Sequence, residues 1–144
     1  MKRYVAEVTV RYAETDRMGV AHHSSFFLWF EIARTGLLRE SGHRYRDMER
    51  AGTLLPMIDC TCRYHKGVDY DDHLHIETTV ADLRSRSITF HYVVTRNGER
   101  VAEGSTRHIC TNPEYQLRRL PTRLVEDVAA YRAPATISEA QPGQ

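Results

Sequence analysis

Alternation of apolar and polar residues predicts where the strands of this chain lie. It has the period of two that is typical of a strand with one buried face. The segments that show it are 4–12, 58–64, 74–80 and 88–94. One more strand, from about 99 to 110, follows Asn97-Gly98, a dipeptide that favours the tight turn of a hairpin. The pattern therefore predicts an antiparallel sheet of about five strands.

One long apolar segment separates the first strand from the others. It runs from Phe26 to Arg39, begins after two serines that suit a helix N-terminus and ends before Gly42. Its first half is apolar on nearly every side, whereas a surface helix keeps one polar face. We therefore expect a helix that is largely enclosed. A curved sheet wrapped around such a helix gives an α+β fold.

The rest of the chain adds two smaller features. A polar stretch after Gly42 leaves room for one more helical turn, and Pro121 begins a last helix with an apolar residue at every fourth position. Residues 133–144 are small and polar, which predicts a disordered tail. A chain of 144 residues has the length of one domain. We predict a single domain over residues 1–132.

Composition excludes several classes of function. Lysine and arginine number 20 against 19 acidic residues, so the formal charge of +1 lacks the basic excess of a nucleic-acid-binding protein. The first residues hold no apolar signal core, and no apolar run is long enough for a membrane span. Three cysteines do not make a disulfide framework. These features favour a cytoplasmic protein.

The loop before the long helix holds the residues best placed for chemistry. Asp16 lies a few residues ahead of the helix start, where unpaired N–H groups can hold a carbonyl oxygen that gains negative charge. Gly19 would let the backbone approach a ligand closely. A structural role fits the same residue types. Asp16 would then cap a turn, Glu14 would be solvated, and the His23 side chain would have its hydrogen bonds made at the helix entry. Residue types alone leave both interpretations open.

The segment 10–34 also carries a recognisable combination. Asp16 is followed by Gly19-Val20, then by His23, then by an aromatic-rich helix that ends Glu-Ile-Ala-Arg. This combination resembles the signature of the hotdog-fold acyl-CoA thioesterases of the 4-hydroxybenzoyl-CoA thioesterase type, and the resemblance continues more weakly to about residue 112. It implies a long helix wrapped by the sheet and protomers joined edge to edge as homo-dimers or homo-tetramers. It also implies hydrolysis of a small or medium acyl-CoA, with no metal or other cofactor.

The resemblance implies a role for each site residue. Asp16 would act as nucleophile or as general base for water, and the family leaves that choice open. The backbone N–H of His23 would polarise the thioester carbonyl, while Gly19 and Val20 shape the approach to it. Further residues would line the acyl or nucleotide part of a substrate held between protomers. These are Tyr64, Arg84, Arg86 and Ser87.

Two departures from the family pattern bear on the substrate. His22 and Ser25 stand where many relatives have an aromatic residue and an asparagine, so the acyl pocket is expected to differ. The segment 69–72 carries three aspartates where relatives often have a basic residue, and an aspartate there would repel a CoA phosphate. Phosphate contacts would then come from Lys66 or from the two arginines at 84 and 86.

Other functions compete with this interpretation. A zinc site from Cys60, Cys62, His73 and His75 is conceivable, although Cys-x-Cys is not the usual finger spacing and the two cysteines alternate as core positions would. The stripe at 90, 92 and 94 could imitate an RNA-stacking platform but is better explained as core or protomer interface. No nucleophilic-serine motif or glycine-rich phosphate loop occurs. The serious competitor is a hotdog protein that binds acyl-CoA as a sensor or scaffold without cleaving it.

Overall fold

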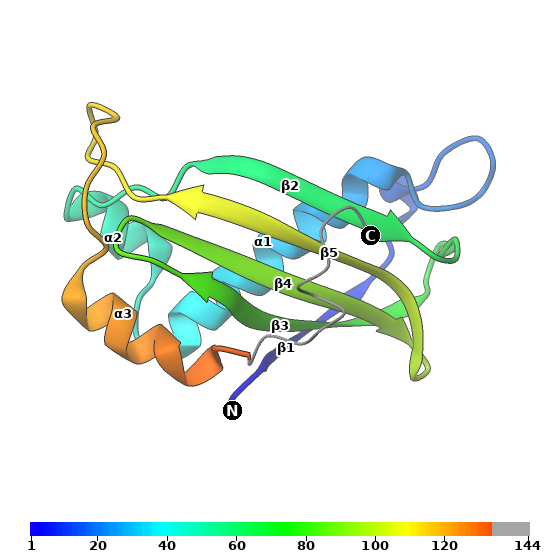
Figure 1. The fold of residues 1–144 in the computed structure, drawn as a ribbon. Helices are drawn as coiled ribbons and strands as arrows, with labels where there is room; N and C mark the ends of the chain where they lie inside the picture. The colour runs from blue at the N-terminus through cyan, green and yellow to red at the C-terminus, as the bar shows by residue number, and fades with distance from the viewer. Residues whose placement is uncertain (134–144) are drawn as a thin grey trace.

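The computed structural model describes residues 1–133, which form five strands and three helices (Figure 1). The strands are β1 (Tyr4–Thr9), β2 (Met57–Tyr64), β3 (His73–Leu83), β4 (Ser87–Arg96) and β5 (Glu99–Ile109). The helices are α1 (His23–Glu40), α2 (Tyr45–Arg50) and α3 (Thr122–Val128), with short 3-10 turns at Tyr12–Glu14 and Ala129–Tyr131. The predicted α+β class and the predicted number of strands are confirmed.

All five strands belong to one antiparallel sheet in the order β1-β3-β4-β5-β2. Helix α1 runs along one face of this sheet, as Figure 1 shows, and the sheet curves around it. The hairpin between β4 and β5 turns at Asn97 and Gly98, whose φ angles are 53° and 80°. Both positions need positive φ in this type of turn, so the predicted hairpin is confirmed.

The core fills the space between α1 and the concave face of the sheet. Phe30 of α1 lies flat on Tyr92 of β4, with ring centroids 4.2 Å apart and an interplanar angle of 5°. Gly104 of β5 makes this approach possible, because a Cβ at that position would press on the Phe30 ring and on the carbonyl oxygen of Thr61 in β2. The predicted stripe at 90, 92 and 94 is fully buried here. It belongs to the core.

The expectation that α1 is largely enclosed holds for the side that faces the sheet and is wrong for the outer side in the single chain. Leu28 and Ile32 are 53% and 49% exposed, on the side of the helix that faces away from the sheet. One curved sheet covers only one side of a helix, so the opposite apolar positions need another surface to be buried. The first strand also ends earlier than predicted, since β1 ends at Thr9 and Tyr12 is 77% exposed in the following turn.

Strand β2 lies at an edge of the sheet and has only β5 as a neighbour among residues 1–133. Cys60 is exposed and Cys62 half-buried, so the prediction that both are core positions fails for Cys60. Met57 and Ile58, at the start of the strand, are also exposed. The alternation in β2 is real, but an edge strand has too few neighbours to bury a whole face.

The C-terminal part of the described chain returns to the sheet. Pro121 precedes α3, as predicted, and Leu124 and Val128 on its inner side are buried. Ala133, which the sequence assigned to the tail, donates its N–H to the carbonyl oxygen of Val80 at 3.0 Å. The remainder of the predicted tail, residues 134–144, lies outside the described residues. No helix among residues 1–133 has the length and apolar character needed to cross a membrane.

Candidate active site

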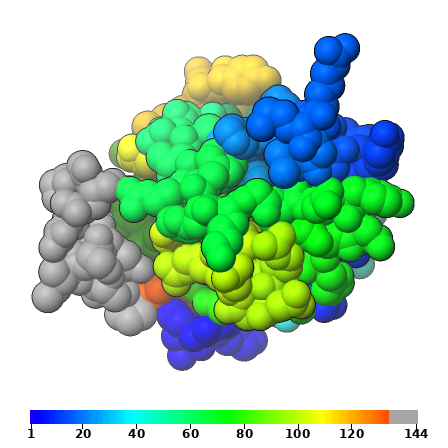
Figure 2. Space-filling model, turned by 90° about the vertical axis from the view of Figure 1, so that its right-hand side faces the viewer, coloured from blue at the N-terminus to red at the C-terminus, as the bar shows by residue number. Residues whose placement is uncertain are grey.

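Three connections meet at one end of the molecule. Figure 2 views this end and shows the loop before α1 in blue beside the β2–β3 connection in green and the β4–β5 turn in yellow-green. Ala21 donates its N–H to the carbonyl oxygen of Val68 at 2.7 Å, which joins the loop before α1 to the β2–β3 connection. The side chain of Arg96 donates to the carbonyl oxygen of Gly67 at 3.3 Å, which joins the β2–β3 connection to the β4–β5 turn. Hydrogen bonds to main-chain carbonyl oxygens therefore hold the loop that carries Asp16 against its neighbours.

Glu14 anchors the start of this loop, so the interpretation of Glu14 as a solvated residue is wrong. Its carboxylate is buried and accepts hydrogen bonds from the N–H of Arg11 at 2.7 Å and from the indole N–H of Trp29 at 2.9 Å. Burial acts to raise the pKa of Glu14, but these hydrogen bonds outweigh it and lower the pKa below its usual value. The carbonyl oxygen of Glu14 also accepts the N–H of His22. Glu14 thus ties both ends of the loop to α1.

Asp16 lies in a tight turn between these anchors and is exposed in the single chain. Its Oδ1 accepts the N–H of Met18 at 2.8 Å, and its own N–H donates to the carbonyl oxygen of Val20 at 2.9 Å. The carboxylate is therefore oriented by the turn itself. Within the described residues it makes no hydrogen bond to an amide of α1, so any catalytic contact requires a ligand or another chain.

Gly19 and Val20 shape the same turn. Gly19 has a φ of 81°, and a Cβ there would have no atom within 4 Å. Glycine suits the positive φ at this position, and the space around it is open, so the expected close approach of a ligand stays a prediction. Val20 bridges to Asp69 of the β2–β3 connection and is half-buried.

The start of α1 leaves one amide of its first turn available. His22 caps the helix, since its Nδ1 accepts the N–H of Ser24 at 3.2 Å and its carbonyl oxygen accepts the N–H of Ser25 at 2.9 Å. The N–H of His23 donates none of the hydrogen bonds found within residues 1–133. Tyr64 holds this residue from β2, because its ring stacks on the His23 ring at 4.2 Å and its hydroxyl donates to the His23 carbonyl oxygen at 3.0 Å. Burial raises the pKa of Tyr64 well above its usual value, so the hydroxyl stays protonated.

The structure separates the remaining predicted substrate-binding residues from this group. Arg84, Arg86 and Ser87 lie at the β3–β4 turn, at the opposite end of the sheet in Figure 1. Strand β3 has 11 residues between the two ends, which at about 3.3 Å per residue corresponds to roughly 35 Å. Arg84 donates to the carboxylate of Asp82 at 2.8 Å, and Ser87 is buried. Within one chain these residues and Asp16 do not form one site.

The sheet also keeps the candidate zinc ligands apart. Cys60 and Cys62 lie on β2 at one edge, in register with residues of β5 that face α1. His73 and His75 lie on β3, beside the opposite edge, where their neighbours Leu74 and Ile76 point into the core. The two pairs therefore face opposite sides of the sheet. A four-ligand zinc site from these residues is not formed in the chain.

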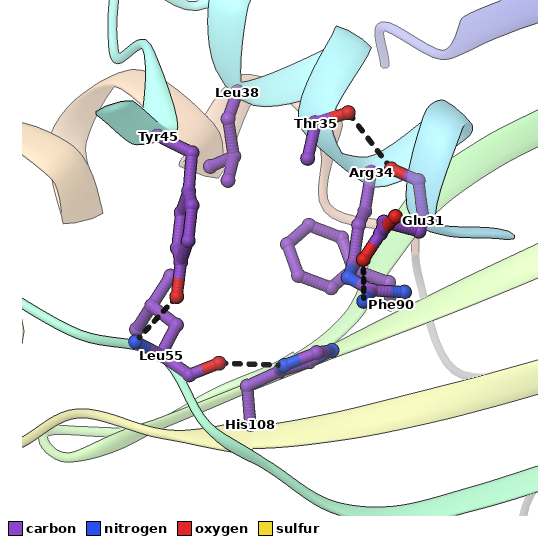
Figure 3. A pocket seen from close by; sticks show the side chains of 8 residues that line it. All are labelled: Glu31, Arg34, Thr35, Leu38, Tyr45, Leu55, Phe90 and His108. Carbon is purple, nitrogen blue, oxygen red and sulfur yellow. Dashed lines mark hydrogen bonds and ion pairs between the residues drawn. The ribbon is translucent and has the colours of Figure 1, made fainter. Parts of the chain in front are cut away.

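A pocket of about 110 Å³ lies between α1 and the sheet, near α2 (Figure 3). Apolar and polar side chains share its walls. They are Glu31, Arg34, Thr35, Leu38, Tyr45, Leu55, Phe90 and His108. The side chain of Arg34 is only 15% exposed, and its partner Glu31 is 3.8 Å away and largely exposed. The pocket therefore holds a nearly enclosed guanidinium whose carboxylate partner faces solvent.

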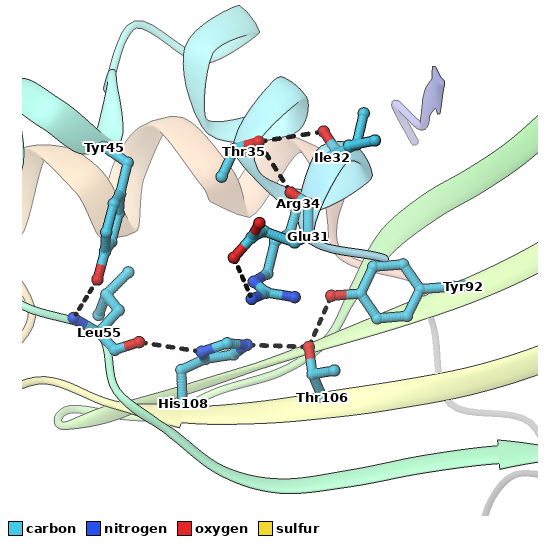
Figure 4. Close-up of polar contacts among 9 residues, drawn as sticks. All are labelled: Glu31, Ile32, Arg34, Thr35, Tyr45, Leu55, Tyr92, Thr106 and His108. Carbon is cyan, nitrogen blue, oxygen red and sulfur yellow. Dashed lines mark hydrogen bonds and ion pairs between the residues drawn. The ribbon is translucent and has the colours of Figure 1, made fainter. Parts of the chain in front are cut away.

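Behind this pocket runs a chain of buried hydrogen bonds, drawn in Figure 4. The hydroxyls of Tyr92 and Thr106 lie 2.6 Å apart, Thr106 Oγ1 lies 2.9 Å from His108 Nε2, and His108 Nδ1 lies 3.1 Å from the carbonyl oxygen of Leu55. Because the carbonyl can only accept, His108 carries its proton on Nδ1. Burial, and next the positive charge of Arg34, lower the pKa of His108 to about 4. The imidazole is neutral at physiological pH.

Comparison with known proteins places this architecture in a family. The profile of the thioesterase-like superfamily matches residues 10–140. The chain belongs to this superfamily. Its fold is the hotdog fold of the thioesterases, in which a sheet wraps one long helix. The superfamily assignment agrees with the resemblance carried by segment 10–34.

Individual members of the superfamily align over most of the chain. The acyl-CoA thioester hydrolase YbgC of Escherichia coli O157:H7 is 27% identical over 122 residues, which cover 83% of this chain and 91% of that protein. The crystal structure of TT1821 from Thermus thermophilus superposes with a TM-score of 0.85 at 33% identity, covering 89% of this chain and 98% of that one. The crystal structure of the DHNA-CoA thioesterase from Staphylococcus aureus superposes with a TM-score of 0.80 at 33% identity, covering 83% of this chain and 82% of that one.

Proposed function

We propose that this chain is an acyl-CoA thioesterase that hydrolyses a small or medium acyl-CoA to the free acid and CoA. Relatives that align over most of their length are named for this reaction or for hydrolysis of an aromatic acyl-CoA. The observation that carries the proposal is the loop before α1, which orients the exposed carboxylate of Asp16 and leaves the N–H of His23 free of partners within residues 1–133.

Asp16 is the reacting group in this proposal. As a nucleophile, its carboxylate would add to the thioester carbonyl and expel CoA as the thiolate, leaving an acyl anhydride that water then hydrolyses. As a general base, it would take a proton from water as that water attacks the carbonyl. In both routes the carbonyl oxygen gains negative charge, and the N–H of His23 at the start of α1 would stabilise it. Tyr64 would keep His23 in place.

The proposed site is completed by a second copy of the chain. In one chain the β2 edge is open, Leu28 and Ile32 are exposed, and Arg84 to Ser87 lie at the far end from Asp16. Antiparallel pairing of two β2 edges about a two-fold axis would bring the far end of one protomer to the Asp16 end of the other. Arg84, Arg86 and Ser87 could then contact a substrate held by the partner's loop. We propose a homo-dimer, or a homo-tetramer built from two such dimers.

The same two-fold axis suggests where the acyl group lies. The pocket beneath α1 is at the end of the molecule that holds α2 and the β3–β4 turn (Figure 1), so it would lie near the partner's Asp16 loop. It is a confined space of about 110 Å³. That volume supports a small acyl group. Lys66 and Arg84 are weaker candidates for a phosphate contact than expected, because Lys66 pairs with Glu99 at 2.7 Å and Arg84 pairs with Asp82 at 2.8 Å.

A cytoplasmic location and a reaction without a metal complete the proposal. Cys60, Cys62 and Cys110 are free cysteines in the structure, and unpaired thiols persist in a reducing compartment. The carboxylate and the helix amide together supply the attacking group and the charge stabilisation that thioester hydrolysis needs, so the proposed route requires no cofactor.

The deciding experiment follows loss of thioester absorbance over a panel of short, long and aromatic acyl-CoAs. Direct absorbance avoids a thiol reagent, which would also react with the exposed Cys60. We expect turnover with some members and a loss of about a hundredfold to ten-thousandfold in kcat for Asp16→Asn. Asparagine keeps the oxygen that accepts the Met18 N–H, so the turn is preserved.

The matched control is Glu126→Gln, the same exchange of carboxylate for amide on the exposed side of α3. It should leave kcat unchanged. Light scattering on the same samples should give the mass of a dimer or tetramer for all three proteins. Binding of acyl-CoA with no turnover for any member would favour the sensor or scaffold instead. Undiminished turnover in Asp16→Asn, or a monomer with full activity, would refute the proposed mechanism.

A further inference from the structure

Three ionisable side chains converge on the face of the sheet that points away from α1. Glu7 of β1 is the register partner of His75 of β3, and His73 lies two residues along the same strand and so shares that face. Glu7 Oε1 is 3.1 Å from His75 Nε2 and 3.3 Å from His73 Nε2. One ligand atom from each residue lies within 4.8 Å of the others. We call these residues the β1–β3 trio.

The distances from Glu7 to the two histidines match those between neighbouring ligands of a metal ion. Nitrogen and oxygen ligands bound to Zn²⁺ at about 2.0–2.1 Å with tetrahedral angles are about 3.3 Å apart. The two distances from Glu7 Oε1 to the histidine nitrogens have this length. The ion would take the place of the hydrogen bonds that join Glu7 to the two imidazoles. The sheet register holds the backbone positions of all three residues.

A neighbouring hydroxyl supports the required form of one histidine. Thr9 is the register partner of His73, and its Oγ1 lies 3.3 Å from His73 Nδ1. When Nδ1–H donates to this oxygen, the lone pair of Nε2 faces Glu7. Histidines that bind metals commonly donate their other ring N–H to such an acceptor, which fixes the tautomer and the ring orientation. Thr9 therefore supplies a second contact that points to a metal ligand.

We propose that the β1–β3 trio binds a divalent first-row transition metal, with Zn²⁺ as the reference ion. Two imidazoles and one carboxylate form a donor set that zinc favours, whereas Mg²⁺ and Ca²⁺ prefer oxygen ligands alone. The three side chains are between 45% and 63% exposed, so water can fill the remaining coordination positions. The metal would join the end of β1 to the start of β3, on the opposite face of the sheet from the proposed catalytic residues.

A second histidine and glutamate group on the same face provides a matched control. His65 Nε2 lies 3.2 Å from Glu103 Oε1, but His91 Nε2 lies 3.9 Å from the other oxygen, Oε2. This group does not bring three ligand atoms within 4.8 Å of one another. It tests whether any pair of surface histidines near a carboxylate is sufficient to bind the metal ion.

The test titrates metal-free protein with Zn²⁺ alone, and separately with Ni²⁺, by calorimetry. We expect one ion per chain, a loss of affinity greater than about a hundredfold in His75→Gln and Glu7→Gln, and about tenfold in Thr9→Val. His65→Gln should bind as the unaltered protein does. Thermal unfolding gives a second measurement, because an ion that binds only the folded chain raises its Tm. Zn²⁺ should raise the Tm of the unaltered protein but not of His75→Gln.

Several outcomes would overturn the proposal. A titration in which the unaltered protein binds no ion would contradict it, as would binding of Zn²⁺ by His75→Gln with the same affinity and stoichiometry. Equal weakening in His65→Gln would show that surface histidines bind the ion without a built site. The test needs no thioesterase activity, so its result does not depend on the proposed function.

Discussion

Acid should destabilise this fold through His108, and the effect can be calculated from its surroundings. Folded His108 stays neutral down to about pH 4, since burial and the charge of Arg34 oppose its protonation. In the unfolded chain the same side chain takes up a proton below its usual pKa of 6.5. The unfolded state therefore binds more protons between pH 6.5 and pH 4, so the free energy of unfolding falls as the pH is lowered through this window.

The magnitude follows from the separation of the two pKa values. Each unit corresponds to about 1.4 kcal/mol, so lowering the pH from 8 to 5 should remove about 2 kcal/mol of stability through this side chain alone. At pH values below both pKa values, the total loss of stability through His108 approaches about 3 kcal/mol. Such a change is a large part of the about 5–15 kcal/mol that stabilises a typical domain.

The assay compares urea unfolding of the unaltered protein and His108→Gln at a series of pH values and one protein concentration. The variant loses the titrating group, while other acid-sensitive groups such as Glu14 remain in both proteins. The difference between the two free energies of unfolding should therefore shrink by about 2 kcal/mol from pH 8 to pH 5, because only the unaltered protein is destabilised through this residue. A difference that stays constant across the range would refute the assignment of a buried neutral imidazole.

Two further substitutions test the packing that supports the site. Trp29→Phe removes the indole N–H that Glu14 accepts; it should cost about 1–3 kcal/mol in urea unfolding and lower kcat, because Glu14 anchors the loop of Asp16. Unchanged stability would mean that another donor replaces the indole. Gly104→Ala places a methyl group against Phe30 and the Thr61 carbonyl; it should cost about 3 kcal/mol or prevent folding, and a variant as stable as the unaltered protein would contradict this packing.

Much of the fold could be predicted from local pattern because each strand and helix carries its own periodicity. The five strands, the long helix and the hairpin at Asn97-Gly98 all follow from such signals. Exposure was harder to predict, because it depends on which strands become neighbours. Cys60 alternates like a core residue but lies on an edge strand, and Leu28 belongs to an apolar helix whose outer side no strand covers.

The surroundings of the site depended on contacts between distant segments. Glu14 appears solvated from its neighbours in sequence, yet Trp29, 15 residues later, makes it a buried anchor. A tryptophan one helix turn into an apolar segment was the available signal, because a buried indole N–H needs an acceptor. The chain of hydrogen bonds from Tyr92 to His108 depends on the register of β4 against β5, which no local pattern predicts. The roles of Asp16 and His23 remain predictions, and the geometry of the loop supports them.

The turn around Asp16 is held by main-chain atoms, and this has a consequence for how the protein can vary. The hydrogen bonds that shape it run from Asp16 to Val20, from Gly19 back to Asp16 and from Ala21 to Val68. None of them uses the side chain of Arg17 or Met18, both of which are exposed. These two positions can therefore accept many amino acids while the carboxylate keeps its place. Natural drift or a directed library at Arg17 and Met18 could therefore change the surface beside Asp16 without rebuilding the turn that holds it.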